Sequence, residues 1–287
     1  MDQSKTNFFI GLGTGALIGC LASYFYATNI KTNRLPKLKP KSVTLTYWKG
    51  RGLCESIRMT LACAGIKWTH VVPGFNNVSH LDQPEHINYL RTNNYLVAGQ
   101  VPLLRMDGNS YVQSMATVRM LARRFELAGN TFEEMTKVDI IAEIIKDWRT
   151  SIGGSWEYGM NGFEPTEEIR DKVIKGNKKY IPIITNVLLH SNNKDKKDKK
   201  NTNYYIAGTL TITYADVLAL EVFEMLIEGK HMNMATLNND VIANYYKLLK
   251  NNTNLNNYLK SNLRLNKTCQ NEIKNYIKSV QRTLAPA

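Results

Sequence analysis

The chain has 287 residues, 43% of them hydrophobic, which is enough for one large or two modest domains with a substantial core. Its formal net charge is +13, but residues 31–41 and 194–200 together carry +8 of it, and no basic stripe with interleaved aromatic residues remains, so we expect no nucleic-acid partner. The four cysteines form no Cys-x-x-Cys pair and the five histidines lack metal-ligand spacing, so neither a disulfide framework nor a metal site is expected.

Residues 8–27 form a charge-free run of 20 residues, which as a helix would span about 30 Å, close to the thickness of one bilayer core. A weakly basic start and a poor cleavage site favour an uncleaved N-terminal transmembrane helix over a signal peptide. The basic residues 31–41 follow it, and the positive-inside rule then predicts a body that faces the cytosol. The mitochondrial outer membrane and the endoplasmic reticulum both accept such an anchor.

A mixed four-stranded sheet is predicted after the Pro-containing spacer at residues 32–41. The order of the elements is βαβ, then a helix, then ββα, by β-branched and apolar periodicity. The predicted strands are Val43–Trp48, Lys67–Val72, Leu103–Met106 and Ser110–Gln113, and the predicted helices are Glu55–Gly65, an irregular stretch at His80–Arg91, and one that begins at Gln113-Ser114.

The segment Gln100–Arg124 contains a strand, a tight turn, a second strand and a helix start. The turn is expected at Asp107-Gly108-Asn109, because Gly and Asn tolerate positive φ. The unpaired N–H groups of a helix that begins at Gln113-Ser114 would attract a carboxylate, and Pro102 is a candidate for a cis bond. An ordinary βαβ fragment has the same pattern, so this segment alone leaves both interpretations open.

Only helices are predicted from Thr131 onward. Two long helices are expected first, and a Thr213–Asp216 capping box then precedes an apolar run. The Lys-rich stretch between the second long helix and the capping box is predicted to be a solvated loop. The bounds are Thr131–Ile152 and Glu167–His190 for the long helices, Asn192–Asn203 for the loop, and Asn271–Gln281 for the last helix.

Four motifs, in this order, resemble those of the glutathione transferases. LTYWKGRGLCESIR at Leu45–Arg58 is similar to the family's first strand, its tyrosine and the following R-G turn, with a mu-like Y-W-x-x-R-G-L string. LRTNNYLVAGQVP at Leu90–Pro102 is similar to the alpha-class second helix and third strand. VQSMA at Val112–Ala116 is similar to the family's Q-S helix start, and Tyr204–Val217 to the entrance of its sixth helix.

The resemblance covers about Ser42–Leu263 and implies an α+β, thioredoxin-like domain followed by an all-α domain. The domain boundaries that we predict are 1–41 for the anchor and spacer, 42–126 for the thioredoxin-like glutathione-binding domain, and 127–287 for the helical domain. Glutathione is then a co-substrate, and no bound cofactor is expected.

Tyr47 is the catalytic residue that the resemblance implies. Glutathione reacts as its thiolate, whereas a free thiol is mostly protonated at neutral pH. The phenol O–H of Tyr47 would donate to the sulfur and stabilise the anion. The alternative is an aromatic residue that only packs in a strand.

The resemblance also implies a set of glutathione-binding residues around Tyr47. The backbone of Val101 would pair with the cysteinyl part of the peptide, and Gln113 with Ser114 would hold the γ-glutamyl carboxylate. Arg91 would lie near the glycine carboxylate, and Asp147 would reach the γ-glutamyl amine across a dimer. Solvated charges or plain cap residues are the alternatives. The full set is Tyr47, Trp48, Arg91, Gln100, Val101, Pro102, Gln113, Ser114 and Asp147.

Three positions bear on how far the resemblance extends. Leu53 stands where alpha enzymes place a second arginine near the sulfur, so thiolate stabilisation would rest on Tyr47. Ala98 stands where alpha enzymes place an aromatic key for the partner subunit, which leaves a homodimer open. Cys54 would be a structural residue, because Tyr47 occupies the position that cysteine-dependent transferases use.

Gly11, Gly15 and Gly19 would line one face of the anchor and permit close helix pairing. The equal alternative is that these glycines only lower the hydrophobicity of the anchor. The electrophile pocket is expected between the Tyr47 turn, the end of the first long helix and the last helix. Trp48, Trp156 and Met160 are candidate walls of this pocket, and core packing is the equal alternative for each.

The leading function is a membrane-anchored glutathione transferase that acts on small apolar electrophiles. A glutathione-dependent peroxidase or isomerase needs the same thiolate and is the related alternative. A non-catalytic binding or assembly protein on the same fold is the alternative from a different class.

Overall fold

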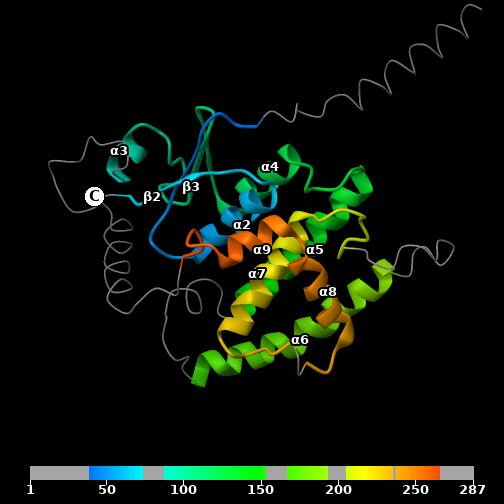
Figure 1. Cartoon of the computed structure of the whole chain (residues 1–287). Helices are drawn as coiled ribbons and strands as arrows, with labels where there is room; N and C mark the ends of the chain where they lie inside the picture. Colours follow the sequence, from blue (N-terminus) through cyan, green and yellow to red (C-terminus); the bar gives the residue numbers. More distant parts are fainter. Residues whose placement is uncertain (1–38, 74–86, 153–166, 193–204, 235–236, 266–287) are drawn as a thin grey trace, which may run out of the picture. The chain divides into compact units, whose positions relative to one another are not determined.

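The computed structural model describes residues 39–73, 87–152, 167–192, 205–234 and 237–265 (Figure 1). The structure divides after Leu38, and the description below concerns the unit that begins at Lys39. None of the helices in the described ranges is long and apolar enough to cross a membrane. The predicted anchor at residues 8–27, most of the Lys-rich stretch and the last predicted helix lie outside the described residues.

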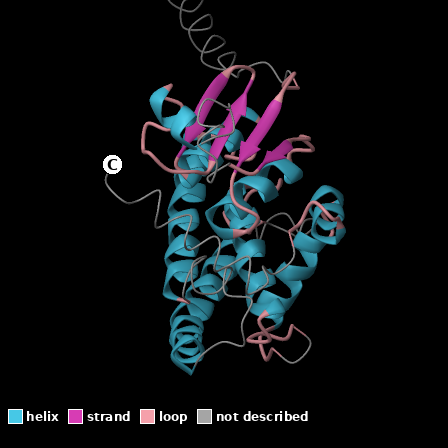
Figure 2. Cartoon of the chain, turned by 90° about the vertical axis from the view of Figure 1, so that its left-hand side faces the viewer, coloured by secondary structure: helices cyan, strands magenta, loops and turns pink. Residues whose placement is uncertain are grey.

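Four strands form one mixed sheet in the order β2-β1-β3-β4 (Figure 2). Strand β1 pairs in parallel with β2 and antiparallel with β3, so that Leu45 lies opposite both His70 and Leu104. This register buries Leu45 and Leu104 completely. The four-stranded mixed sheet predicted from the sequence is confirmed. The strands are β1 Val43–Thr46, β2 Thr69–Val71, β3 Leu103–Met106 and β4 Asn109–Val112.

Helices α2 and α4 pack against each other beside this sheet, and α2 is also covered by α7 and α9 (Figure 1). All nine residues of α2 are therefore buried, including its polar ones, whereas α4 buries only one face. The helical elements of this region are η1 Gly52–Cys54, α2 Glu55–Cys63, α3 Ile87–Thr92 and α4 Ser114–Arg124. These bounds agree with the predicted order of elements.

A two-residue turn, Asp107-Gly108, joins β3 to β4, and both of its residues have positive φ (51° and 86°). Such a turn matches the right-handed twist of a hairpin. Asn109 belongs to β4 and pairs with Met106, so the three-residue turn predicted here was one residue too long. The Asp107 carboxylate accepts hydrogen bonds from the N–H groups of Lys41 and Ser42, which fixes the hairpin to the chain before β1.

The remaining helices form the second half of the unit, with α7 at its centre. Helix α7 contacts α2, α5 and α8, and its residues are buried from Tyr214 to Leu226. The predicted capping box is confirmed, since Thr213 and Asp216 exchange hydrogen bonds at the N-terminus of α7. The helices are α5 Phe132–Ser151, α6 Glu167–Asn192, α7 Tyr214–Glu228, α8 Asp240–Lys250 and α9 Thr253–Lys260.

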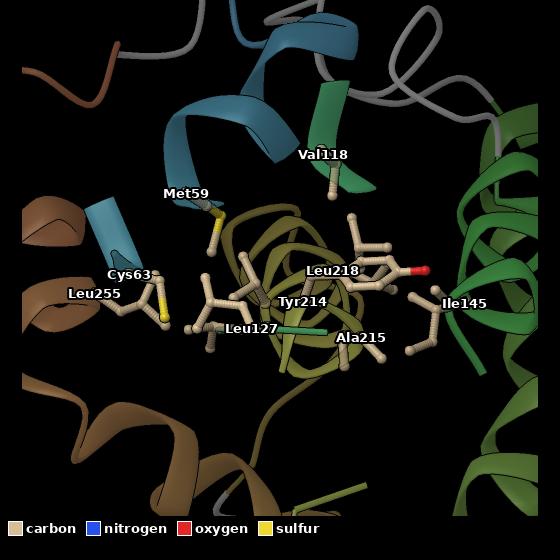
Figure 3. Close-up of a cluster of buried hydrophobic side chains, with 14 of the residues drawn as sticks. Met59, Cys63, Val118, Leu127, Ile145, Tyr214, Ala215, Leu218 and Leu255 are labelled. Carbon is tan, nitrogen blue, oxygen red and sulfur yellow. The ribbon is translucent and has the colours of Figure 1, made fainter. Parts of the chain in front are cut away.

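One apolar core joins the sheet-bearing part to the helical part (Figure 3). Met59 of α2 and Val118 of α4 meet Leu218 of α7, and Ile145 of α5 and Leu255 of α9 belong to the same cluster. Each of these five side chains is at most 4% exposed. This packing fixes α2, and with it the turn after β1, against the helical part.

Candidate active site

Tyr47 follows the last residue of β1 and is 4% exposed. Its N–H donates to Val71 O at 3.0 Å, and its carbonyl accepts a hydrogen bond from His70 Nε2 at 3.0 Å. Its hydroxyl accepts a hydrogen bond from the N–H of Leu53 at 3.2 Å. A phenol oxygen that accepts one such bond keeps its O–H as a donor.

Gly52 makes this approach of the Tyr47 hydroxyl possible. Its φ is +41°, and a Cβ built at this position would lie 2.4 Å from Tyr47 Oη. A side chain at residue 52 would therefore displace the hydroxyl as well as strain the backbone.

Two charged side chains from helices α5 and α7, Arg149 and the buried Glu221, lie at the same turn. Arg149, in the last turn of α5, donates from Nη2 to Gly52 O at 2.8 Å and pairs with Glu221 of α7 at 2.8 Å. The Glu221 carboxylate also accepts a hydrogen bond from Ser56 Oγ at 2.6 Å. Burial raises the pKa of Glu221, although Arg149 and Ser56 oppose this effect. Sequence reasoning missed Arg149, because a basic residue at a helix C-terminus is common and gives no signal of such a contact.

Arg58 of α2 lies beside the ring of Tyr47. Its guanidinium carbon is 5.9 Å from the centroid of the Tyr47 ring, and its side chain is 1% exposed. The Nη1 atom donates to Gly50 O at 2.9 Å and pairs with Glu55 at 3.3 Å. The turn after β1 is thus held by arginines from two different helices, the buried Arg58 and the partly buried Arg149.

The Val101-Pro102 peptide bond is cis, as the sequence predicted. It directly precedes β3, and Thr46 pairs with Leu103 in the β1–β3 ladder. Because these partners are neighbours of Tyr47 and Pro102, the register brings Tyr47 and the cis bond to the same end of two adjacent strands.

Gln113 lies at the same end of the next strand, because Val112 pairs with Leu103. It is the N-cap residue of α4 with φ +66° and ψ 106°, it makes no side-chain capping bond, and it is exposed. A non-glycine residue in this region of φ and ψ costs of order 1–3 kcal/mol and is found most often at functional sites. Ser114 then opens α4, as predicted.

Arg91 lies in the last turn of α3, and Gln100 lies in the loop that leads from this helix to Val101. Arg91 Nε donates to Gly99 O at 3.0 Å, so the arginine holds the residue before Gln100. Gln100 itself is exposed. Five predicted residues, Tyr47, Gln100, Val101, Pro102 and Gln113, therefore gather at one end of the β1-β3-β4 part of the sheet.

Two family models match the chain in succession. The model for the glutathione S-transferase N-terminal domain matches residues 43–123, and the model for the glutathione S-transferase C-terminal domain matches residues 146–262. The chain belongs to the glutathione S-transferase family. Its N-terminal domain is thioredoxin-like, with the mixed four-stranded sheet, and its C-terminal domain is helical.

Curated relatives and solved structures agree with this assignment. The chain is 28% identical to glutathione S-transferase alpha-4 of Rattus norvegicus. The match covers 67% of this chain and 76% of the relative. The chain is 27% identical to glutathione S-transferase 3 of Caenorhabditis elegans, over 66% of its length and 83% of the relative. A nu-class structure from Haemonchus contortus shares the fold with a TM-score of 0.57 at 24% identity, covering 80% of this chain and 98% of that one.

The other predicted site residues are less closely joined to this group. Trp48 is 7% exposed and packs in the main core. Asp147 is exposed on α5, a helix that carries none of the other predicted residues. The candidate pocket walls Trp156 and Met160 lie outside the described residues.

Cys54 does not have the properties of a thiol nucleophile. It is completely buried, and burial raises the pKa of its thiol to about 12. Since the thiolate is the reactive form, this residue is inert at neutral pH, as the sequence-based interpretation expected. Within the described ranges, no group of three or more His, Cys, Asp or Glu side chains is placed to hold a metal ion.

Proposed function

We propose that the protein conjugates glutathione to small apolar electrophiles, and that Tyr47 stabilises the reacting thiolate. The observation that carries the proposal is the alignment of Tyr47, cis-Pro102 and Gln113 at one end of three adjacent strands. This alignment offers a hydroxyl donor, the backbone of Val101 before β3 and a helix N-terminus to one extended tripeptide.

The tripeptide would be held along this end of the sheet. The backbone of Val101 pairs with its cysteinyl part, and Gln113 with Ser114 receives the γ-glutamyl carboxylate at the start of α4. Arg91 lies toward the glycine carboxylate, a charge-assisted contact. Gln100, Trp48 and Asp147 complete the proposed binding set.

In the chemical step, the Tyr47 O–H donates to the glutathione sulfur and lowers the pKa of its thiol. Each unit of lowering corresponds to about 1.4 kcal/mol, which one hydrogen bond to a charged acceptor supplies. The thiolate then attacks the electrophilic carbon. A C–S bond forms, and the leaving group of an aryl halide departs with its electron pair.

The decisive experiment uses the full chain, purified in a mild detergent. We expect retention on immobilised glutathione and conjugation of an aromatic halide. Tyr47→Phe should keep the retention and reduce kcat/KM about 10- to 100-fold, because it removes only the donor to the developing thiolate. Tyr180→Phe, which alters a buried tyrosine of α6, is the matched control and should match the wild type.

The other outcomes separate the alternative functions. A wild-type chain that neither binds glutathione nor turns over the halide would end the enzyme proposal. Retention without turnover, unchanged by Tyr47→Phe, would favour a non-catalytic binding protein on the same fold. Turnover of a hydroperoxide in place of the halide would favour the peroxidase alternative.

We further propose that residues 8–27 anchor the protein in a membrane, with the body facing the cytosol. The apolar run and the basic residues that follow it support this proposal. Imaging a fluorescent fusion of residues 1–45 would distinguish the mitochondrial outer membrane from the endoplasmic reticulum, and a diffuse signal would contradict the anchor. Crosslinking the full chain against a chain that begins at Ser42 would show whether the glycine-faced segment supports a homodimer.

A further inference from the structure

A continuous chain of polar contacts connects helix α7 to the hydroxyl of Tyr47. It runs from Glu221 to Arg149 at 2.8 Å, and from Arg149 Nη2 to Gly52 O at 2.8 Å. Across the Gly52–Leu53 peptide it continues from the Leu53 N–H to Tyr47 Oη at 3.2 Å. Each link is within contact distance, and the chain contains one carboxylate, one guanidinium and one peptide group.

The peptide between Gly52 and Leu53 is the central link. A trans peptide is planar and directs its C=O and N–H to opposite sides. Arg149 therefore binds one side of this peptide while Tyr47 lies on the other. The Gly52 carbonyl also accepts a hydrogen bond from the N–H of Glu55, so the peptide plane is fixed by two donors.

A charged donor on the carbonyl changes the strength of the N–H on the far side. Hydrogen bonds in a chain polarise one another, with an effect of about 10–30% per bond, and bonds to ionised groups are the strongest. A stronger Leu53 N–H withdraws electron density from the phenol oxygen, which makes the Tyr47 O–H a better donor to a thiolate. The side chain of Leu53 carries no charge, so residue 53 contributes only through its backbone.

Burial keeps this effect from being screened by water. The side chains of Arg149 and Glu221 are 13% and 3% exposed, and Tyr47 is 4% exposed. The Glu221 carboxylate is oriented by Ser56, which fixes the guanidinium of Arg149 in turn. The position of the charge is thus set by helices α2, α5 and α7 together.

We propose that Arg149 is a positioning residue for the transferase reaction and acts on Tyr47 through the Gly52–Leu53 peptide. The proposal rests on the proposed function, because it takes Tyr47 as the thiolate stabiliser. A purely structural interhelical ion pair is the alternative, and it would affect stability without affecting the thiol of bound glutathione.

Arg58 and His70 also lie close to Tyr47, and their charge states must stay constant in the test. Arg58 lies beside the ring and bonds to the carbonyls of Gly50 and Arg51. His70 binds the Tyr47 carbonyl, and burial lowers its pKa, so it is neutral at neutral pH. Neither residue changes when Arg149 is replaced, so a difference between variants reports on Arg149.

The test measures the pKa of the thiol of glutathione bound to the full chain, from the ultraviolet absorbance of the thiolate. Arg149→Met should raise this pKa by roughly half a unit to one unit, a three- to tenfold loss of thiolate below the pKa. Arg149→Lys keeps the charge and should recover part of the shift. Arg119→Met is the matched control, because Arg119 also joins α5 to a neighbouring helix through an ion pair with Glu143, but at a different place.

Combining the variants with Tyr47→Phe decides the mechanism. We call the path from Glu221 through Arg149 and the Gly52–Leu53 peptide to the Tyr47 hydroxyl the relay. In the Tyr47→Phe background, Arg149→Met should have no further effect on the thiol pKa, because the relay ends at the removed hydroxyl. An equal shift with and without the hydroxyl would overturn the relay. An unchanged thiol pKa in Arg149→Met, beside a raised one in Tyr47→Phe, would overturn the relay and leave the proposed function intact.

The remaining outcome concerns the proposed function itself. If Tyr47→Phe leaves the bound thiol unchanged, both the relay and the proposed role of Tyr47 fail. Should Arg149→Met not fold, Arg149→Lys and Glu221→Gln carry the test, since each weakens the same link while retaining a polar side chain. A thiol pKa equal to that of the wild type in both would then overturn the relay.

Discussion

Ser56 Oγ on α2 donates a 2.6 Å hydrogen bond to Glu221 Oε2 on α7, and both side chains are at most 3% exposed. This bond joins the thioredoxin-like domain to the helical domain at the point where α2 and α7 pack. It belongs to a larger group of buried and partly buried charges at this junction, which comprises Glu55, Arg58, Arg149, Glu221, Glu224 and Arg264.

The Ser56–Glu221 bond should be a measurable part of the free energy of unfolding. Ser56→Ala leaves one buried carboxylate oxygen without this donor, and we expect a loss of about 1–3 kcal/mol. Thr136→Ala is the control, because the Thr136 hydroxyl bonds to a carbonyl on an exposed part of α5 and should cost under about 0.5 kcal/mol. Urea unfolding measures both variants, and equal losses would contradict the prediction.

Gly52 should be needed for the reaction and not only for the turn. In Gly52→Ala the new Cβ would lie 2.4 Å from the present position of Tyr47 Oη and would therefore displace the hydroxyl. We expect kcat/KM for halide conjugation to fall by roughly tenfold or more, as for other losses of an oriented donor. Gly108→Ala is the matched control, since Gly108 also has positive φ but has nothing within 4 Å of an added Cβ.

Each of the two glycine variants should lose about 1–2 kcal/mol in its free energy of unfolding, because each places a side chain at positive φ. Only Gly52→Ala should lose turnover. Equal turnover in the two variants, each normalised to folded protein, would show that the contact with Tyr47 does not matter.

The order of strands and helices along the chain could be predicted because each element depends on local signals, whereas the strand order within the sheet was not predicted. Alternating apolar residues such as those around Leu45 define strands, and the Thr213 capping box marks the start of α7. The Asp107-Gly108 turn was one residue shorter than predicted, since Asn109 was free to join either the turn or the strand.

The site could be predicted only in part. Tyr47, the cis-Pro102 bond and Gln113 follow from motifs that are continuous in the sequence. The contact of Arg149 with Gly52 spans 97 positions and depends on how α5 packs beside α2 and α7, which no local pattern contains. The positive φ of Gln113 was equally invisible, because glutamine has no preference for that region.

Gln113 should show a trade between stability and binding. Gln113→Gly removes the strain of a side chain at φ +66°, so we expect the apo protein to gain about 1 kcal/mol in its free energy of unfolding. The same change removes a side chain proposed to hold glutathione, so retention on immobilised glutathione should weaken. Thermal or urea unfolding and glutathione titration measure the two effects.

Lys230→Gly is the matched control for Gln113→Gly. Lys230 also has positive φ (60°) and is exposed, but it follows α7 and is not among the residues proposed to hold glutathione. It should stabilise the fold similarly and leave glutathione affinity unchanged. Loss of affinity in both variants would argue that Gln113 acts through general stability and not through the ligand.

Glu224 should make stability depend on pH in a defined direction. Burial opposes its ionisation, but hydrogen bonds from Lys250 and Tyr246 at 2.8 Å outweigh it, so the pKa of Glu224 is lowered from 4.5. Below pH 4.5 the unfolded chain binds this proton before the native one does. The stability that Glu224 contributes is therefore complete above pH 4.5 and is lost as pH falls through the lower native pKa.

Glu224→Gln removes this pH-dependent contribution. We expect it to cost about 1–3 kcal/mol at neutral pH, and the difference from the wild type should shrink as pH falls below about 4.5. Urea unfolding across this range measures the difference. Glu168→Gln is the control, because Glu168 is 78% exposed in its pair with Lys172 and should give a difference near zero at every pH. A constant difference for Glu224→Gln would mean that its carboxylate contributes through packing and not through charge.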